Sequence, residues 1–475
     1  MSIEKIEFET LIKDDTIFYT PMHIGIQANN IAWFGNLTFK NTFDLSNMCI
    51  QYNQHKIYDL NSSHLEEDSF RFKYLKGVNN NIESLKFNDC VFEKEPLIHN
   101  NAIENISFYD CKFNCDIYNL LKKYKDNNLI IAFINCTLSR VLINSIFNTK
   151  YKLNLFRIDE GSIQQLQIED VNIENKFYIN KQYNNNKNIV KINELVIKNS
   201  IFKENFKLHN CEINKIYFED IDFEKHADFY MSKFKKGLDL NAIYAGKDEN
   251  PNIYFKAINF KGLAIFGDCT FQEKIIFEWV TFEGFSHFRR TKFCKGLDLD
   301  YTNIEKEMNF FSVKELDNKI SKKNTSQETY RIIKHNFEKI ENKIEANKYH
   351  ALELEKKRKN KKTPFFEKIV LNIHWITSRN GTNWFIPLLL ILTIGVLTTL
   401  GLHFSNFISF ICDPKENIKY IAKGFNELFK HVYILTKYKD TWNTFPNAII
   451  LAVNKFSLGY LYYQFLISVR KDTRK

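Results

Sequence analysis

Residues that could carry out chemistry are present in this chain, but most of them stand at the spacing of a structural repeat. Cys111 and Cys115 have three residues between them, and two such thiols could be a metal-binding pair. Cys111 also falls two residues before a bulky apolar residue. Four further cysteines share that position: Cys90, Cys136, Cys211 and Cys269. We therefore favour buried, reduced thiols over a metal pair, which suits a cytosolic location, and we expect no metal and no cofactor.

The twelve histidines are scattered, and no catalytic motif accompanies them. His209, His226 and His287 stand beside repeat positions, where we interpret them as surface residues and not as catalytic bases. The chain contains no P-loop, no dinucleotide-binding glycine motif, no GxSxG nucleophile motif and no zinc-type spacing. The sequence therefore predicts a protein that is not an enzyme.

One further reactive group lies in an apolar stretch near the C-terminus. Lys455, next to Asn454, is close to the middle of the segment 446–469. An ammonium group that faces lipid at such a depth costs about 2.5–3.5 kcal/mol on insertion scales. We therefore expect Lys455 to face a water-filled cavity, a neighbouring subunit or the other apolar segment. In that other segment, Thr398, Thr399 and His403 offer polar atoms to it. Two alternatives stay open: the ammonium reaches the outer headgroups through a thinned bilayer, or the segment is partly re-entrant.

The chain is organised around the stretch 258–304, in which bulky apolar residues follow one another at gaps of six and five residues. These residues are Phe260, Phe266, Phe271, Phe277, Phe282, Phe288, Phe293, Leu299 and Ile304. Neither an α-helix nor a flat strand has such a period, whereas a coil of short straight edges with one large inward side chain each does. A small residue two positions earlier would let neighbouring coils stack at the strand spacing of about 4.8 Å. The sequence thus predicts a β-solenoid with columns of phenylalanine.

A looser form of the repeat runs through the preceding chain, as in LKFNDCVF from Leu85 and IYFEDIDF from Ile216. The segment KFKKGLDLN from Lys233 returns as KFCKGLDLD from Lys292, which indicates internal duplication. An Asp or Asn often precedes the small residue. We expect its side chain to hydrogen-bond the backbone at a corner of the coil.

This pattern resembles the pentapeptide-repeat proteins over roughly residues 37–310. The resemblance implies a right-handed quadrilateral β-helix without catalytic residues. It also implies that Phe266 or Phe277, and the residue two positions before each, point inward. Some members of that family mimic DNA, but they are strongly acidic, and residues 1–314 of this chain have a net charge of only −3.

The segments on either side of the solenoid are expected to close its ends. Residues 1–36 lack a clean repeat and are the predicted cap of a solenoid that covers 37–314. In 315–362 the pattern becomes helical, with a Thr325–Glu328 capping box. The apolar stripe of this helical segment is Tyr330, Ile333, Phe337, Ile340 and Ile344. A break near Asn342 would make a hairpin, and an unbroken rod is the alternative. We favour a cap and spacer over a coiled coil, because two heptads are short for one.

A membrane-binding region is predicted next. The run Lys356–Lys362 is basic at six of its seven positions and precedes the amphipathic segment 363–383. Together these predict an interfacial helix whose basic collar binds anionic lipid headgroups. The segment 384–404 has 21 residues and no formal charge, which predicts a first membrane span.

The segment 446–469 is the predicted second span, and the loop 405–445 would then face outward. Basic residues before the first span and in the tail 470–475 predict that both termini lie on the cytoplasmic side of the inner membrane. The stretch SRNGTNWFIP from Ser378 and the ending GYLYYQFLISVRKDTRK look like a recurring two-span tail of bacterial pentapeptide-repeat membrane proteins. That resemblance brings no established activity with it.

The charge is unevenly distributed along the chain. Residues 315–475 carry 27 Lys and Arg against 14 Asp and Glu, whereas residues 1–314 carry 39 against 42. A solenoid that is not basic is a poor candidate for binding nucleic acid. The first fifteen residues contain no apolar run, so we expect no cleaved secretory signal.

Two hypotheses of function follow. The first is a membrane-anchored, non-enzymatic interaction or sensor protein whose cytosolic solenoid holds an unknown protein partner. The alternative is a homo-oligomeric, two-span, channel-like pore whose opening is coupled to the solenoid. The loop 405–445 weakens the alternative, because it contains no TVGYG-like filter sequence.

Overall fold

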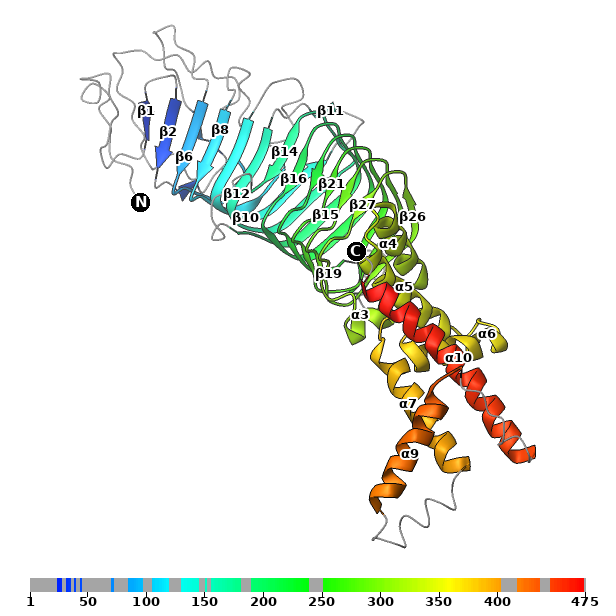
Figure 1. Ribbon diagram of the computed structural model, residues 1–475. Helices are drawn as coiled ribbons and strands as arrows, with labels where there is room; N and C mark the ends of the chain where they lie inside the picture. Colours follow the sequence, from blue (N-terminus) through cyan, green and yellow to red (C-terminus); the bar gives the residue numbers. More distant parts are fainter. Residues whose placement is uncertain are drawn as a thin grey trace. The chain divides into compact units, whose positions relative to one another are not determined.

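The structure is a computed structural model, and two compact units make up the chain: Met1–Thr325 and Ser326–Lys475 (Figure 1). The residues that it describes are 24–27, 31–35, 38–39, 43–44, 70–71, 84–96, 105–118, 130–144, 150–151, 155–180, 189–238, 251–402, 417–435 and 445–473. The predicted order, a β-solenoid followed by helices, is confirmed. Most of the predicted N-terminal cap lies outside the described residues.

The first unit is a parallel β-solenoid. Its strands are β1 Ile24–Gln27, β2 Ile31–Gly35, β3 Thr38–Phe39, β4 Phe43–Asp44, β5 Phe70–Arg71, β6 Ser84–Asn88, β7 Val91–Phe92, β8 Asn105–Tyr109, β9 Lys112–Ile117, β10 Ile130–Asn144, β11 Lys150–Tyr151, β12 Leu155–Glu169, β13 Asn172–Ile173, β14 Lys176–Ile179, β15 Val190–Phe202, β16 Phe206–Leu208, β17 Cys211–Phe223, β18 Ala227–Asp228, β19 Lys233–Gly237, β20 Ile253–Phe260, β21 Ala264–Ile265, β22 Thr270–Phe271, β23 Ile275–Phe282, β24 Ser286–His287, β25 Lys292–Phe293, β26 Leu297–Ile304 and β27 Met308–Asn309. Strand β20 pairs in parallel with β23, and β23 pairs in parallel with β26. Among the described strands, only β1 and β2 pair antiparallel.

The eleven-residue period of the sequence corresponds to half a coil. Partners in adjacent coils near the C-terminal end, such as Asp268 and Arg290, are 22 residues apart. Corners with left-handed backbone conformation recur at Ala257, Asp268, Trp279 and Arg290, with φ between 50° and 60°. Each coil therefore has two such corners, and the similar sequence of the two halves produces the shorter period.

Asp and Asn dominate the corner position because they tolerate the left-handed conformation better than other residues with a β-carbon. They occupy it at Asp89, Asp110, Asn135, Asp170, Asn199, Asn210, Asp220 and Asp268. Side chains at this position also bond along the corner column, as in the 3.0 Å hydrogen bond from Asn199 Nδ2 to Asp170 Oδ1. The sequence predicted hydrogen bonds from these side chains to the backbone, whereas the bonds described here join side chains of neighbouring coils.

The core consists of stacked aromatic rings. Phe260, Phe266, Phe271, Phe277, Phe282, Phe288 and Phe293 are each at most 1% exposed. The Phe266 ring lies 4.8 Å from the Phe229 ring and 4.9 Å from the Phe288 ring, and both pairs are nearly parallel. Burial of one phenylalanine side chain contributes about 1.5–3 kcal/mol, so these columns dominate the stability of the solenoid. Ile304, in the last full coil, is only half-buried.

The residue two positions before the bulky residue of a repeat is often one that can donate a hydrogen bond as well as one that is small. The Ser232 hydroxyl donates to the Leu208 carbonyl at 2.6 Å, and the Cys269 thiol donates to the Phe229 carbonyl at 2.8 Å. The Thr291 hydroxyl donates in the same way to the Phe266 carbonyl. Each bond satisfies a buried carbonyl of the preceding coil, which explains why Cys, Ser and Thr recur there.

Side chains that follow the last coil cover its edge. Helix α3 (Lys319–Asn324) was not predicted, and Asn324 Nδ2 donates to the Lys295 carbonyl at 2.8 Å. Asn318 Nδ2 donates to the Cys294 carbonyl, and Thr325 Oγ1 accepts from the Leu297 amide. These bonds satisfy backbone groups that would otherwise leave an open edge for pairing with another chain.

The second unit is helical, and its described helices are α4 Gln327–Lys339, α5 Lys343–Lys359, α6 Phe365–Ser378, α7 Phe385–Leu402, α9 Asn417–Val432 and α10 Phe445–Thr473. Helices α4 and α5 form the hairpin alternative, because Glu341 is left-handed and Asn342 caps α5. The unbroken rod is wrong. The N-cap of α4 is Ser326, one residue after the predicted Thr325, and it accepts from the Thr329 amide.

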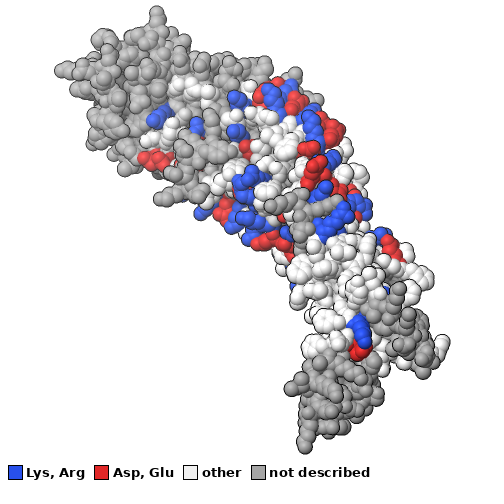
Figure 2. Space-filling model, in the orientation of Figure 1, with Lys and Arg blue, Asp and Glu red and all other residues white. Residues whose placement is uncertain are grey.

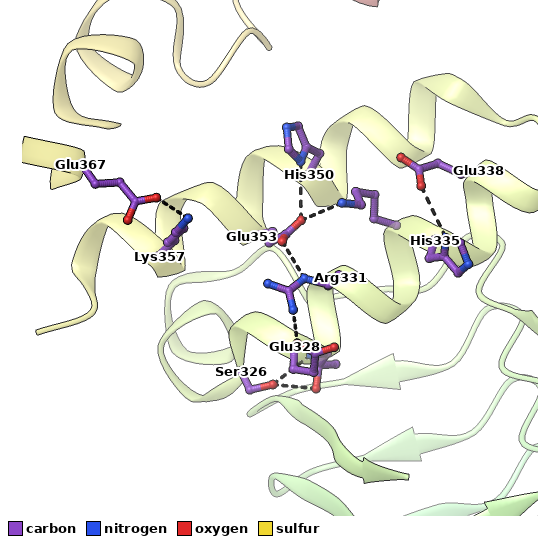
Figure 3. A network of polar contacts seen from close by, with 11 residues as sticks. Ser326, Glu328, Arg331, His335, Glu338, His350, Glu353, Lys357 and Glu367 are labelled. Carbon is purple, nitrogen blue, oxygen red and sulfur yellow. Dashed lines mark hydrogen bonds and ion pairs between the residues drawn. The ribbon is translucent and has the colours of Figure 1, made fainter. Parts of the chain in front are cut away.

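The hairpin is held by its apolar seam and by one buried carboxylate (Figure 3). Tyr330, Ile333 and Phe337 are buried, whereas Ile340 and Ile344 are exposed because the chain turns between them. Glu353, on α5, accepts from Arg331 Nε and from Lys334 Nζ, both at 3.0 Å. His350 Nδ1 also lies 3.5 Å from the same carboxylate. Burial alone would raise the pKa of Glu353, but the bonds from His350, Lys334 and Arg331 outweigh it and lower the pKa to about 2.

Candidate functional site

The exterior of the helical unit is apolar. Phe366 on α6, Leu397 on α7 and Phe456 on α10 are 80%, 62% and 83% exposed. Further exposed apolar side chains of these helices and of α9 are Phe365, Val370, Ile376, Phe385, Leu389, Leu392, Val396, Phe425, Phe429, Ile449, Val453, Tyr463 and Leu466. In Figure 2 the solenoid surface carries interleaved positive and negative charges, whereas the visible helical surface is mainly uncharged. A surface with this many exposed apolar side chains is typical of one that contacts a protein partner or a membrane.

Helix α7 carries no charged residue along its 18 residues. By length and hydropathy it is the one membrane-span candidate among the described helices. The predicted second span, 446–469, lies inside α10, a single unbroken helix of 29 residues that is too polar to qualify by the same measure. Lys455, Asn454 and Gln464 supply much of that polarity, so the contacts of these side chains determine how α10 can be buried.

The polar side chains of α10 point inward. Asn454 is 1% exposed and donates from Nδ2 to Thr398 Oγ1 on α7 at 2.8 Å. Gln464 is 4% exposed and accepts at Oε1 from the Ser378 hydroxyl at 3.0 Å. Leu458, between them along the helix, is fully buried. The buried side of α10 therefore alternates apolar contacts with hydrogen bonds to α7 and to the end of α6.

Lys455 has main-chain partners that the sequence did not indicate. Its Nζ donates to the Ile434 carbonyl at 2.6 Å and to the Tyr433 carbonyl at 3.2 Å. Both carbonyls follow the last residue of α9, where a helix leaves unpaired acceptors and the negative end of its dipole. Thr398 accepts a hydrogen bond from the neighbouring Asn454 and not from Lys455. Thr399 donates within its own helix to the Gly395 carbonyl. His403 lies outside the described residues.

Helix α9 lies in the segment predicted as an outer loop, and it packs on α7 and α10. A β-carbon on Gly395 of α7 would come within 2.4 Å of Val432 Cγ2, so the glycine permits the close approach of α9. Val432 and Ile434 also pack against the buried residues Ile391, Leu458 and Leu461. Asn454 Nδ2 donates to the His431 carbonyl at 3.2 Å. The three helices thus share one small core around Asn454.

The predicted basic collar begins at the C-terminal end of α5. Lys357 forms an ion pair with Glu367 on α6, and Lys359 forms one with Glu355 one turn earlier. Lys361 and Lys362 are exposed. Positive side chains at this position also complement the helix dipole of α5, so part of the collar has a structural role.

The other reactive side chains do not assemble a metal centre in the described part of the chain. No group of three or more His, Cys, Asp and Glu residues that could hold a metal occurs there. The neighbouring Cys136 thiol and burial raise the pKa of Cys111 to about 12, so Cys111 is a protonated core residue. The pKa of Cys115 is also raised to about 12, chiefly by burial.

The interpretation of the three histidines as surface residues is partly wrong. His226 is exposed, but His209 is only 5% exposed and its Nε2 lies 2.6 Å from Asp228 Oδ2 in the next coil. His287 is half-buried, and burial lowers its pKa. The partner of His209 follows it by nearly one coil, so the coil length would have indicated the pair.

Comparisons with protein-family models, with curated proteins and with solved structures gave no significant match for this chain.

Proposed function

We propose that this chain is a membrane-anchored, non-enzymatic interaction or sensor protein whose solenoid presents a surface to a protein partner in the bacterial cytosol. In this proposal α7 and α10 cross the inner membrane, and both termini lie on its cytoplasmic side. The observation that carries the proposal is the exposed apolar exterior of the helices, together with an α7 that has no charge. Lipid is the solvent that fits such an exterior.

The contacts of α10 support a second span despite its lower hydropathy. A lysine within a span is tolerated when its charge meets acceptors, and Lys455 meets two carbonyls at the end of α9. The buried bonds of Asn454 and Gln464 place the other polar groups between helices, away from lipid. The role of the solenoid as a binding surface is supported by the charged pairs on its exterior, such as Lys256 with Glu219 and Lys295 with Glu273. The 22-residue coil of two similar halves supports a pentapeptide-repeat type of right-handed, quadrilateral β-helix.

The proposed topology can be tested by labelling intact cells with a membrane-impermeant maleimide. We expect Cys412, in the segment between α7 and α10, to react from outside, and the buried solenoid thiols to stay unlabelled. A cysteine introduced in place of Asp472 should react only after the membrane is opened. Labelling at position 472 in intact cells would reject the placement of both termini in the cytoplasm.

A second candidate function is an oligomeric, two-span pore. The observation that favours it is α9, a helix between the two spans that packs on both and whose terminal carbonyls turn toward α10. A pore of this type requires several subunits around an axis. Measurement of the mass in detergent and of conductance in planar bilayers tests it. A monomer without conductance rejects the pore, and a tetramer whose conductance changes in Lys455→Gln favours it.

A further inference from the structure

Three cationic side chains from distant parts of the sequence gather at the turn between α6 and α7. The indole of Trp375, on α6, lies between two guanidinium groups. The Arg358 guanidinium carbon is 4.3 Å and the Arg379 guanidinium carbon is 3.7 Å from the centre of the ring. Arg358 lies in the last turn of α5, whereas Arg379 directly follows α6, so the indole joins the two chain segments.

The third cation comes from the end of α10. A β-carbon on Gly381 would lie 3.0 Å from Lys471 Nζ, so the ammonium group rests directly against the turn. Arg379, Asn380 and Gly381 are all left-handed, with φ of 49°, 63° and 80°. The absence of a side chain at Gly381 is therefore needed both for the conformation of the turn and for the approach of Lys471.

These cations have no counter-charge among the described side chains. Glu353 is engaged in the hairpin network, Glu355 with Lys359 and Glu367 with Lys357. The side chain of Asp472, which follows Lys471 in the sequence, lies outside the described residues. Arg358 donates from NH1 to Asn372 Oδ1 at 3.1 Å, a neutral acceptor, and its buried Nε has no hydrogen-bond partner. Arg379 is exposed, whereas Arg358 and Lys471 are partly buried, and partly buried cations without a carboxylate favour an anion from outside.

Two groups near the turn have lowered pKa values, chiefly because they are buried. Burial lowers the pKa of Lys471. Burial, and then the positive charges of Lys471 and His350, lower the pKa of His374, which precedes Trp375. The contribution of Lys471 to the pKa of His374 shows that these two groups are close enough to interact.

We propose that Arg358, Arg379 and Lys471 form a binding site for one phosphate group, supplied by the headgroup of an anionic phospholipid. Guanidinium groups recognise phosphate through paired, charge-assisted hydrogen bonds, and the Trp375 indole holds both of them in place. The site lies at the start of α7, where a lipid phosphate would be within reach if α7 crosses the membrane, so this inference rests on the proposed function. It extends the predicted collar Lys356–Lys362 from general attraction to a defined site.

The test uses the full chain in a mild detergent, with short-chain phosphatidylglycerol as the probe and binding followed by intact-protein mass spectrometry. We expect saturable binding of one lipid, weakened roughly tenfold or more by Arg379→Gln and by Lys471→Gln separately. The matched control is Lys361→Gln with Lys362→Gln, which removes two charges from the exposed collar and should change the affinity by no more than about twofold. Equal weakening by the control and the site variants would overturn the proposal, because it would assign binding to overall charge.

Two further arms separate the source of the phosphate and the membrane question. Millimolar inorganic phosphate that displaces the lipid completely would assign the site to free phosphate and overturn the lipid source. Short-chain phosphatidylcholine, which carries the same phosphate without net charge, should bind much more weakly, and equal binding would overturn the requirement for an anionic lipid. Alkaline extraction of the wild-type chain from membranes tests the anchoring independently. Lipid binding in detergent by a chain that is released in this extraction would refute the proposed function and leave the site itself supported.

Discussion

The two units of this protein place their polar and apolar side chains in opposite ways. In the solenoid the rings of Phe266 and Phe288 are fully buried, and charged residues such as Lys256 and Glu219 pair on the outside. In the helical unit the buried residues include Asn454 and the fully buried Ser468, whereas Phe456 is 83% exposed. Water favours the first arrangement, because apolar surface leaves it at a gain of about 25 cal/mol per Å². The second arrangement agrees with the proposed membrane anchor, because the interior of a bilayer has no such preference and cannot hydrogen-bond.

We expect the largest loss of stability from a charge placed in the solenoid core. Phe266→Asp places a carboxylate among stacked rings, and we expect a loss of roughly 5 kcal/mol or more, enough to unfold the unit. The measurement is thermal unfolding of a soluble fragment 1–325 by circular dichroism. A control is the exposed Lys112→Asp, which should melt as the wild type does. Lys274 is unsuitable as a control, because its Nζ lies 2.6 Å from Asp298. An unchanged melting curve for Phe266→Asp would mean that the inward register is wrong.

The helical unit should respond to a charge on its outside, where a water-soluble protein would tolerate one. Leu392, on α7, is 47% exposed, and Leu392→Lys should cost about 2.5–3.5 kcal/mol of membrane insertion. The readout is the fraction of full-length chain that stays with membranes in alkaline carbonate. On the solenoid, Ile189→Lys changes a residue that is 38% exposed and should have an effect within about 0.5 kcal/mol. Equal, small effects at both positions would remove the distinction between the two exteriors.

The hairpin of α4 and α5 is the part of the helical unit that behaves like an ordinary protein in water. Glu353→Gln keeps the shape of the side chain but removes its charge, and we expect a loss of about 1–3 kcal/mol at pH 7. Because the pKa of Glu353 is lowered from 4.5 to about 2, the stabilisation is fully present above about pH 4.5 and is lost as pH falls through about 2. Thermal unfolding in detergent at pH 7 and pH 3 should therefore show the two proteins converging at low pH. A constant difference would assign the effect to packing and not to charge.

The smallest effect concerns the corners of the solenoid. Met231 occupies a left-handed corner position with φ of 58°, where many other corners have Asp or Asn, and it is 38% exposed. Met231→Asn should stabilise the solenoid by about 0.5–1 kcal/mol, whereas the β-branched Met231→Ile should destabilise it. The melting temperatures of the two variants test this order. The reverse order would show that the corner conformation does not determine residue choice.

The sequence was informative wherever side chains alone determine the structure. The spacing from Phe260 to Phe293 predicted the solenoid, because one inward ring per edge of the coil places phenylalanines at regular intervals in the sequence. The full coil of 22 residues was not predicted, because its two halves carry the same pattern. For the same reason the buried pair of His209 with Asp228 was missed.

Other features were missed in the sequence, and the first of them depends on main-chain hydrogen-bond partners. Lys455 was correctly identified as unusual, but its acceptors are carbonyls of Tyr433 and Ile434, and backbone groups have no sequence signature. Helix α9 was overlooked because Glu427 and Lys430 interrupt an apolar segment, although Phe425, Leu428 and Val432 recur at the spacing of a helix. The two charges lie one turn apart and bond to each other at 2.7 Å, which is compatible with a helix at an interface.

The anchoring of the full-length chain in lipid is tested most directly by alkaline carbonate extraction of membranes from cells that produce it. Exposed apolar side chains on α6, α7, α9 and α10 predict that the chain stays in the membrane pellet and that detergent is needed to release it. Recovery of the chain in the carbonate supernatant as a monodisperse protein, with no detergent present, would contradict the membrane anchor.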